Sequence, residues 1–274
     1  MPLPPLALTI AGSDSGGGAG IQADLKTFHA LGVYGTSAIT AITAQNTLGV
    51  RAVHAVPLEI VRAQIAAVAE DLPPRACKTG MLATAELVVA VADAIRDHRL
   101  PNFVLDPVMV ATSGDRLLDR DAERTVLREL VPLCTLVTPN LDEAAILTGQ
   151  RPSRPRELRS VAEALLEAGA GAVLVKGGHL PGDEVVDLYF DGQEERVWRR
   201  PRLATSSTHG TGCTLSAAVA AGLAHGRPLL AAVGDALDFV QRALESAPGL
   251  GAGHGPLNHF IAPVESAPPL PSGP

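Results

Sequence analysis

The order of apolar and polar positions along the 274 residues predicts that strands and helices alternate through most of the chain. Short apolar runs bounded by glycine, proline or aspartate are typical of buried strands, and longer runs with apolar positions three or four apart are typical of helices. The predicted strands are Leu6–Ala11, Tyr34–Ala44, Ala76–Thr79, Asn102–Leu105, Thr135–Thr138 and Ala172–Lys176, followed by a β-hairpin of Glu184–Phe190 and Arg196–Trp198. The predicted helices are Ile21–Leu31, Leu58–Asp71, a segment from Thr84 to about His98, Asp119–Glu129, Leu141–Leu147, Ser160–Ala168, Gly212–Ala224 and Pro228–Glu245.

Repeated strand–helix units favour an α/β fold, in which helices cover both faces of a mostly parallel central sheet. Nothing in the sequence marks a boundary between domains, so we expect a single domain over residues 1–260. The segment 261–274 is rich in proline and serine, and we expect it to be disordered. In such folds ligands bind at the carboxyl ends of the strands. Polar clusters follow the predicted strands here, which predicts a site at that edge.

Composition narrows the range of partners. The formal net charge is −7, which argues against nucleic acid, because binding it needs a clustered basic surface. No apolar run approaches the roughly 20 residues of a membrane span, and the first residues lack the pattern of a signal peptide. The three cysteines, Cys77, Cys134 and Cys213, have no paired spacing, which fits a reducing compartment and does not fit zinc. We therefore expect a cytoplasmic protein with no membrane partner.

The most informative segment is Thr208–Leu215, which precedes an alanine-rich predicted helix. The first N–H groups of a helix have no intrahelical partner, and the two glycines leave them uncovered by side chains. Such a loop is a typical phosphate site, with Gly210–Gly212 at the anion and Cys213 beside it. The helix terminus is expected to lower the pKa of that thiol. From this segment alone, a glycine-rich helix entry that binds nothing is the alternative.

A second glycine-rich loop, Gly12–Gly20, follows the first predicted strand. It fails the glycine spacing of a dinucleotide-binding fingerprint, and the Lys-Thr pairs of the chain lack the preceding glycine of a Walker A loop. Its glycines would let the backbone approach a small ligand closely. Asp24, in the following helix, either meets that ligand or faces solvent.

Single polar residues at the other strand ends also have two interpretations each. Asp106 is either a partner of magnesium through water or a turn aspartate. Asn140 is expected to cap the next helix, and Glu143 either completes that cap or reaches metal-bound water. Lys176 ends a buried strand beside two glycines, where a phosphate contact is favoured over an idle surface charge.

Two other polar features have no clear role. His179 and His209 lie in polar loops, but neither has a second metal ligand at a suitable spacing. The loop 253–260, rich in glycine and histidine, either has a role that the sequence does not indicate or serves only to pack the C-terminus.

Short blocks of the chain, from about Leu6 to Phe260, together resemble the hydroxymethylpyrimidine/phosphomethylpyrimidine kinases of thiamine biosynthesis, in the ribokinase superfamily. The blocks are residues 11–24 (AGSDSGGGAGIQAD), 43–47 (TAQNT), 78–82 (KTGML), 106–109 (DPVM), 138–140 (TPN), 176–179 (KGGH) and 209–213 (HGTGC). Their shared order and spacing are more specific than any one block. The resemblance implies a ribokinase-like three-layer sandwich. The broader superfamily usually has aspartate as catalytic base at the position of Cys213, and this kinase group has cysteine.

The resemblance also implies an activity and a set of roles. It implies an ATP-dependent kinase that uses Mg²⁺ and phosphorylates 4-amino-5-hydroxymethyl-2-methylpyrimidine and then its monophosphate. The implied pyrimidine pocket consists of Gly12, Asp24, Gln45, Met81 and Val108. The implied ATP site consists of Asn140, Lys176, Thr208, Gly210 and Gly212, and the implied magnesium ligands are Asp106 and Glu143. The implied catalytic group consists of Lys176, Gly210, Thr211, Gly212 and Cys213, with Cys213 in the general-base position.

Two alternatives stay open at this point. A vitamin B6 kinase of the same superfamily is the close one, because pyridoxal also offers a ring hydroxymethyl group, although Met81 resembles the pyrimidine kinases. A non-catalytic pyrimidine sensor is the distant one, and retention of Asp106, Lys176 and Cys213 argues against it. The family also implies a homodimer.

Overall fold

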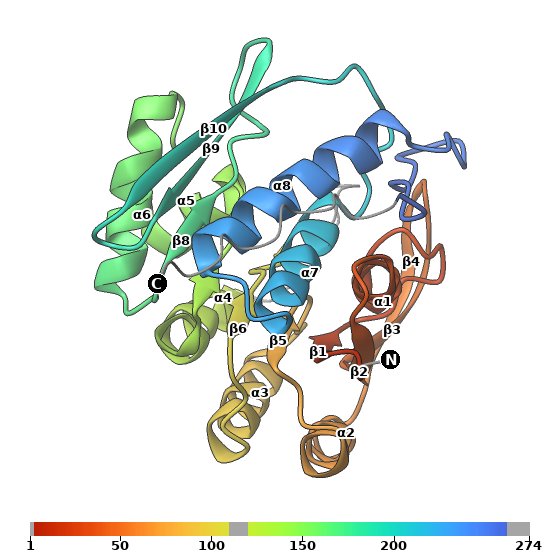
Figure 1. The fold of residues 1–274 in the computed structure, drawn as a ribbon. Helices are drawn as coiled ribbons and strands as arrows, with labels where there is room; N and C mark the ends of the chain where they lie inside the picture. Colours follow the sequence, from red (N-terminus) through yellow and green to blue (C-terminus); the bar gives the residue numbers. More distant parts are fainter. Residues whose placement is uncertain (1–2, 110–119, 262–274) are drawn as a thin grey trace, which may run out of the picture.

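The structure, a computed structural model, describes residues 3–109 and 120–261. Within these residues, eight strands form one sheet that runs through the molecule (Figure 1). The strands are β1 (Leu6–Ala11), β2 (Tyr34–Ile39), β5 (Ala76–Thr79), β6 (Phe103–Leu105), β7 (Leu136–Val137), β8 (Val173–Val175), β9 (Glu184–Phe190) and β10 (Glu195–Pro201). Their order is β10-β9-β8-β7-β6-β5-β1-β2. The strands from β8 to β2 are parallel, and the β9–β10 hairpin is antiparallel at one edge.

Helices cover both faces of this sheet, as the alternating pattern predicted (Figure 1). One face is covered by α1 (Gly20–Ala30), α7 (Thr211–Ala224) and α8 (Leu229–Glu245). The other face is covered by α2 (Leu58–Asp71), α3 (Ala85–Asp97), α4 (Arg120–Thr125), α5 (Leu141–Thr148) and α6 (Leu158–Glu167). The fold is therefore the three-layer α/β sandwich expected from the sequence.

Successive residues of each central strand belong to two separate cores. In β6, Phe103 and Leu105 pack with the α2–α6 layer, whereas Val104 packs with α1, α7 and α8. Side chains of a strand alternate between the faces of the sheet, so a strand covered on both sides must be apolar throughout. This requirement explains why these strands appear in the sequence as short continuous apolar runs.

Helix α7 is buried on almost all sides, because it lies between the sheet, α1 and α8. Half of its buried residues are alanine, and Gly222 lies where α8 crosses it. A Cβ at Gly222 would come within 2.8 Å of the Cβ of Ala232. Small side chains therefore allow α7 to pack closely between the sheet and its neighbouring helices.

The predicted strand Tyr34–Ala44 is wrong as a single strand. The main-sheet strand β2 ends at Ile39, which is paired with Ala11 at the end of β1. Beyond Ile39 the chain leaves the main sheet. It forms β3 (Ala41–Asn46), which pairs with β4 (Gly49–Ala55) in a separate two-stranded antiparallel sheet. The sequence did not indicate β4, because most of its side chains are exposed and no buried face imposes an alternating pattern.

One predicted helix also differs in form from the expectation. The expected helix Asp119–Glu129 becomes α4 followed by a wider π-helical turn, Val126–Leu130, and a short 3₁₀ turn, Val131–Leu133. Asp119 and the expected disordered tail beyond Ile261 lie outside the described residues. Proline at position 132 cannot donate a backbone hydrogen bond, so it interrupts the helical hydrogen bonding after the π-helical turn. Thr84, by contrast, caps α3 as expected, since its hydroxyl accepts from the N–H of Leu87.

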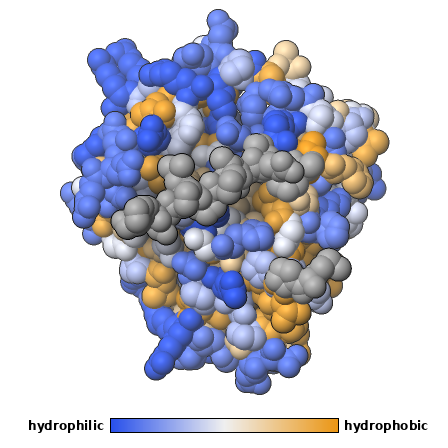
Figure 2. All heavy atoms as spheres, in the orientation of Figure 1, coloured by the Kyte–Doolittle hydropathy of each residue, from blue (hydrophilic) through white to orange (hydrophobic). Residues whose placement is uncertain are grey.

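The face of the molecule drawn in Figure 2 is mostly hydrophilic, with apolar residues in separate patches. Across the described part of the chain, no helix combines the length and the apolar character needed to cross a bilayer.

The packing of α7 predicts opposite effects for two Gly→Ala substitutions in neighbouring helices. Alanine is favoured over glycine in a helix interior by about 1 kcal/mol. At Gly234 in α8 the new Cβ would lie 3.9 Å from Trp198, so Gly234→Ala should raise the free energy of unfolding. At Gly222 the new Cβ would collide with Ala232, and overpacking typically costs roughly 1–3 kcal/mol, so Gly222→Ala should lower it. Urea unfolding of both variants checks this, and equal shifts would contradict the close packing of α7.

Candidate active site

A cleft of about 860 Å³ opens at the carboxyl ends of the parallel strands. It is lined by residues that follow successive strands: Gly12 after β1, Met81 after β5, Asp106 after β6, Asn140 after β7 and Lys176 after β8. The start of α7 and the end of β3 complete its walls with Thr208, Gly210, Thr211, Gly212, Cys213 and Gln45. Val108 and Glu143 also line the cleft. The structure thus gathers all but one of the residues expected at the site, the exception being Asp24.

The start of α7 has the backbone geometry expected of the predicted anion loop. Gly210 is the N-cap of α7 and has a left-handed backbone with φ of 82°. A Cβ at this position would overlap the carbonyl oxygen of Gly18, so glycine is required both by the conformation and by the close approach of the two glycine-rich loops. The Oγ1 of Thr211 donates to the carbonyl of Thr208 at 2.7 Å, which fixes the turn that leads into the helix. The N–H groups of the first helical turn are therefore presented at the cleft.

Lys176 lies between two carboxylates opposite that loop. Its Nζ is 3.3 Å from Oδ1 of Asp106 and 3.7 Å from Oε2 of Glu143. A Cβ at Gly212 would lie 3.2 Å from the same Nζ and 3.7 Å from both carboxylate oxygens of Asp106. Burial alone lowers the pKa of Lys176, but the two carboxylates outweigh that effect and raise it. Lys176 is therefore a permanent cation directly below the anion loop.

Asn140 and Glu143 form a complete capping box at the start of α5. The side-chain oxygen of Asn140 accepts from the N–H groups of Asp142 and Glu143, and Oε2 of Glu143 accepts from the N–H of Asn140 at 2.7 Å. Both capping expectations are confirmed. Burial raises the pKa of Glu143 to about 7, although Lys176 opposes this rise.

Cys213 lies in the first turn of α7, and its side chain is partly exposed. The expected lowering of its pKa is wrong. Burial raises the pKa of the thiol to about 12, and the nearby Lys78 ammonium and a hydrogen bond from the N–H of Gly20 offset only part of the rise. The loss of solvation exceeds the effect of the helix terminus, so the sulfur is a thiol near neutral pH.

Asp24 is fully buried and does not line the cleft. Its carboxylate lies 3.1 and 3.2 Å from Nζ of Lys78, which is also fully buried, and it accepts from Oγ1 of Thr9 at 2.6 Å. Burial alone lowers the pKa of Lys78, and Asp24 more than reverses this effect. The structure therefore places Asp24 neither in solvent nor at the wall of the pyrimidine pocket, but in an ion pair beneath it.

Asp14 and His209 join the two glycine-rich loops. Oδ2 of Asp14 lies 2.8 Å from Nε2 of His209 and also accepts from the N–H groups of Gly18 and Ala19. Burial alone would raise the pKa of Asp14, but these hydrogen bonds lower it. The loop after β1 is thus held against the residue that precedes the anion loop.

Gln45, Met81 and Val108 also line the cleft, and Nε2 of Gln45 lies 3.4 Å from Nε2 of His209, the residue before Gly210. Gln45 lies at an irregularity in the β3–β4 pairing, and its backbone N–H and carbonyl both bond to the Ser15 hydroxyl. Gly12 lies close to Met81, since a Cβ at Gly12 would come within 2.8 Å of Cε of Met81. This part of the cleft therefore presents an amide, a thioether and exposed backbone. The strands that precede Met81 and Lys176, β5 and β8, are separated in the sheet by β6 and β7.

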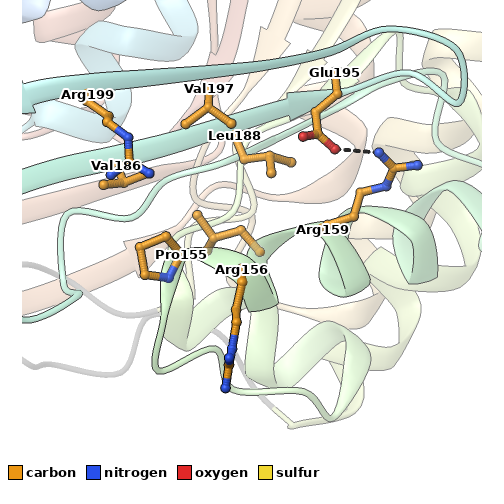
Figure 3. Close-up of a pocket in the computed structure, with 9 residues that line it drawn as sticks. Pro155, Arg156, Arg159, Val186, Leu188, Glu195, Val197 and Arg199 are labelled. Atoms are coloured by element: carbon orange, nitrogen blue, oxygen red, sulfur yellow. Dashed lines mark hydrogen bonds and ion pairs between the residues drawn. The ribbon is translucent and has the colours of Figure 1, made fainter.

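The β9–β10 hairpin forms the remaining wall and separates the cleft from a second cavity. Val185, Asp187 and Arg200 line the cleft, whereas Val186 and Arg199, their neighbours in sequence, line a cavity of about 240 Å³ on the outer face (Figure 3). The outer cavity contains none of the expected site residues. In the cleft wall, Arg200 pairs with Asp187, whose Oδ1 accepts from the N–H of Gly177 at 2.9 Å. This contact fixes the backbone immediately after Lys176.

Sequence reasoning did not single out Asp14, Lys78, Asp187, Arg200 or Ser216. The Ser216 hydroxyl lies 3.3 Å from Oδ2 of Asp106, one helical turn after Gly212, and that spacing was a readable signal. Aspartate in a glycine-rich loop is also a known acceptor for backbone N–H groups. The other three gain their roles from pairing across elements, for which the local sequence has no signal.

Comparisons with known proteins agree with this geometry. Residues 14–258 match the family model described as phosphomethylpyrimidine kinase. A hydroxymethylpyrimidine/phosphomethylpyrimidine kinase of Rhizobium meliloti is 56% identical over 260 residues, which cover 93% of this chain and 97% of the relative. The crystal structure of phosphomethylpyrimidine kinase from Clostridium difficile 630 superposes with a TM-score of 0.78 at 42% identity, covering 87% of this chain and 99% of that one.

The structure of Bacillus subtilis pyridoxal kinase in an ADP complex superposes with a TM-score of 0.88 at 37% identity, covering 94% of this chain and 98% of that one. Vitamin B6 kinases therefore share this fold closely. The family model and the sequence identities nevertheless agree on one assignment: this chain belongs to the phosphomethylpyrimidine kinase family.

Proposed function

We infer that the protein is an ATP-dependent kinase that phosphorylates 4-amino-5-hydroxymethyl-2-methylpyrimidine and then its monophosphate, in thiamine diphosphate biosynthesis. The observation that supports it most directly is the convergence at Gly212. An uncovered helix start, the Lys176 ammonium and the Asp106 carboxylate meet there within contact distance. Phosphoryl transfer requires that the reacting groups are positioned and that the charge on the phosphate oxygens is neutralised. The groups around Gly212 can do both.

On the donor side we assign the ATP phosphates to the backbone of Gly210–Gly212, to Thr208 and to Lys176, with Asn140 at the edge. Fixed N–H donors and an ammonium stabilise developing negative charge without reorganisation. The ion pairs of Lys176 hold its Nζ in place before a nucleotide arrives.

Magnesium fits this side of the cleft. Mg²⁺ usually takes one or two carboxylates and completes its shell with water and substrate phosphates. Asp106 and Glu143 are two such carboxylates beside the phosphate loop, while no cluster of three metal-binding side chains occurs in the described part of the chain. We therefore assign these two residues to Mg²⁺ bound together with ATP, where the ion would neutralise phosphate charge.

On the acceptor side we assign the pyrimidine to the end of the cleft that contains Gln45, Met81, Gly12 and Val108. The amide of Gln45 can pair with a ring edge, and the side chains of Met81 and Val108 offer apolar contact. Asp24 would contribute indirectly, because its ion pair keeps the Lys78 ammonium charged and in place beneath this part of the cleft.

Cys213 occupies the general-base position of this proposal, but as a thiol it is a weak base. The first acceptor is an alcohol, which must lose a proton during transfer. The second acceptor is a phosphate monoester whose oxygen is already ionised near neutral pH. A carboxylate at this position would repel that monoester, whereas a neutral thiol does not.

We also propose that the protein is located in the cytoplasm and forms a homodimer. The three cysteines are unpaired, as a reducing compartment allows. Ile42, Leu48 and Val53 expose apolar side chains on the β3–β4 sheet, which supports self-association there. Sedimentation equilibrium measures the subunit number directly.

A vitamin B6 kinase is the second candidate, favoured by the close superposition with pyridoxal kinase. Release of ADP from Mg²⁺-ATP separates the candidates when it is measured with hydroxymethylpyrimidine, its monophosphate and pyridoxal. We expect turnover with both pyrimidines at a higher kcat/KM than with pyridoxal. Turnover with pyridoxal alone would support the vitamin B6 kinase, and no release with any acceptor would support a sensor.

Substitution of Gly212 by aspartate should abolish turnover. The new carboxylate would lie near Asp106 and within reach of Lys176, so it would occupy the ammonium and repel the phosphates. The affinity for the pyrimidine, measured by calorimetry, should stay within about threefold of wild type, since Gln45 and Met81 are untouched. Turnover near the wild-type rate would disprove the assignment of the phosphate loop.

Substitution of Cys213 by serine should slow the first phosphorylation more than the second. A thiol with a pKa of about 12 becomes more ionised as pH rises through the accessible range, so its contribution as a base should increase with pH. We expect the wild-type to variant ratio of kcat to grow between pH 7 and pH 9 for the alcohol and to stay constant for the monoester. The two steps are assayed from separately purified acceptors, and equal slowing of both at every pH would leave Cys213 with a packing role only.

A further inference from the structure

The loop 253–260, for which the sequence indicated no clear role, overlaps a segment, Gly251–His259, that contacts both sides of the cleft and that we call the strap. It follows α8 and lies beside the β3–β4 hairpin in Figure 1. His254 from this strap lines the cleft. The residues that the strap contacts belong to the acceptor side, to the phosphate loop and to α7.

The first set of contacts is with the turn of the β3–β4 hairpin. The N–H of His254 donates to the carbonyl of Thr47 at 2.8 Å, and the N–H of Gly253 donates to Oγ1 of Thr47 at 3.3 Å. A Cβ at Gly253 would overlap the Thr47 carbonyl oxygen. Thr47 is two residues beyond Gln45, so the strap holds the turn next to the side chain assigned to the pyrimidine.

The second set of contacts is with the phosphate loop. The N–H of His209 donates to the carbonyl of Gly255 at 3.1 Å, and His209 pairs with Pro256 as an isolated parallel bridge. Nδ1 of His254 lies 3.4 Å from Oγ1 of Thr208. The strap thus bonds directly to the two residues that precede Gly210.

The third set anchors the far end of the strap. Nε2 of His259 lies 3.0 Å from Oγ1 of Thr214, in the residue after Cys213, and the N–H of Asn258 donates to the carbonyl of Ala243 in α8. Burial lowers the pKa of His259 to about 4, so this imidazole is neutral and can accept from the Thr214 hydroxyl. Leu257 is buried in the core below α7 and α8.

These contacts matter because the β3–β4 sheet has no strand partner in the main sheet. Its inner end is held by Ser13 and Ser15. Among the described residues, the contacts of Thr47 with other segments are those with the strap. Gln45 is also held directly, since its Nε2 lies 3.4 Å from Nε2 of His209. The strap is therefore a second connection between Gln45 and Gly210, from a segment more than 40 residues away from both in sequence.

We propose that the Gly251–His259 strap is a positioning element that sets the acceptor end of the cleft relative to the phosphate loop. The proposal rests on the proposed function. The strap residues need not touch the reacting atoms, because they act through Gln45 and the Gly210–Gly212 backbone. A misplacement of about 1 Å between reacting groups can reduce a rate by about 100-fold, so displacing the strap should affect turnover more than the binding of either ligand alone.

Gly253→Ala tests this directly, because its Cβ would push the strap away from Thr47 without adding a side chain to the cleft. Ala252→Val is the matched control, since it adds bulk at the exposed neighbouring position. Calorimetry gives the separate dissociation constants of hydroxymethylpyrimidine and of the non-hydrolysable nucleotide AMP-PCP with Mg²⁺. Release of ADP gives kcat per folded protein, with the folded fraction measured by circular dichroism.

We expect Gly253→Ala to lower kcat by at least tenfold while each dissociation constant stays within about threefold of wild type, and Ala252→Val to change none of them. A wild-type kcat per folded molecule, whatever the loss in melting temperature, would overturn the proposal and leave the strap a purely structural role. If Gly253→Ala does not fold, Thr47→Val decides, since it removes only the hydroxyl that accepts from Gly253. It should lower kcat about threefold or more, and an unchanged kcat would overturn the proposal.

The same measurements keep failure of the strap distinct from failure of the proposed function. Wild-type protein that phosphorylates pyridoxal but not the pyrimidine would contradict the proposed function. The strap would then be tested with pyridoxal, because either ring must lie between Gln45 and the phosphate loop.

Discussion

The site depends on how closely α7 approaches the carboxyl ends of the central strands. Half of its buried residues are alanine, and small side chains let the helix start reach the level of Lys176 and Asp106. Gly210 can approach the carbonyl of Gly18 only because it has no Cβ, and Gly212 lies against Lys176 for the same reason. A larger residue at either position would separate the helix N–H groups from the cations and carboxylates that complete the phosphate site.

This constraint explains which features were predictable from the sequence. The central strands are buried on both faces, so their apolar runs were clear, and the polar residues after them share an edge by topology alone. The start of α7 was recognisable because two glycines and a threonine precede an alanine-rich helix, a pattern typical of a phosphate site. A glycine-rich helix entry that binds nothing has the same local pattern. The β3–β4 hairpin was missed because its exposed strand, β4, has no apolar pattern. The other strand of this hairpin, β3, contains Gln45.

The remaining errors concern electrostatics. The local sequence predicted the wrong direction for the pKa shift of Cys213 and did not predict the partner of Asp24. The helix start was expected to lower the pKa of Cys213, but burial raises it, and burial depends on residues distant in sequence. Asp24 was expected to meet either ligand or water, and it meets Lys78 instead. This buried ion pair forms because α1 packs on β1, and β5 lies beside β1 in the sheet, so neither residue reveals the partner by itself. Only the family resemblance pointed to both segments.

The distribution of charge around the cleft also fits an enzyme with two different acceptors. Asp106 and Glu143 are compensated by Lys176, and Asp24 is compensated by Lys78. Asp14 is surrounded by backbone N–H groups and His209. Each of these buried carboxylates therefore has a partner, and Asp106 and Glu143 share theirs. The group that we assign to the acceptor position is a neutral thiol, which would present no fixed negative charge to an incoming phosphate monoester. An aspartate there would help a neutral alcohol lose its proton but would repel the product of that same step. The neutral residue therefore allows one site to perform both transfers in succession, at the expense of base strength in the first.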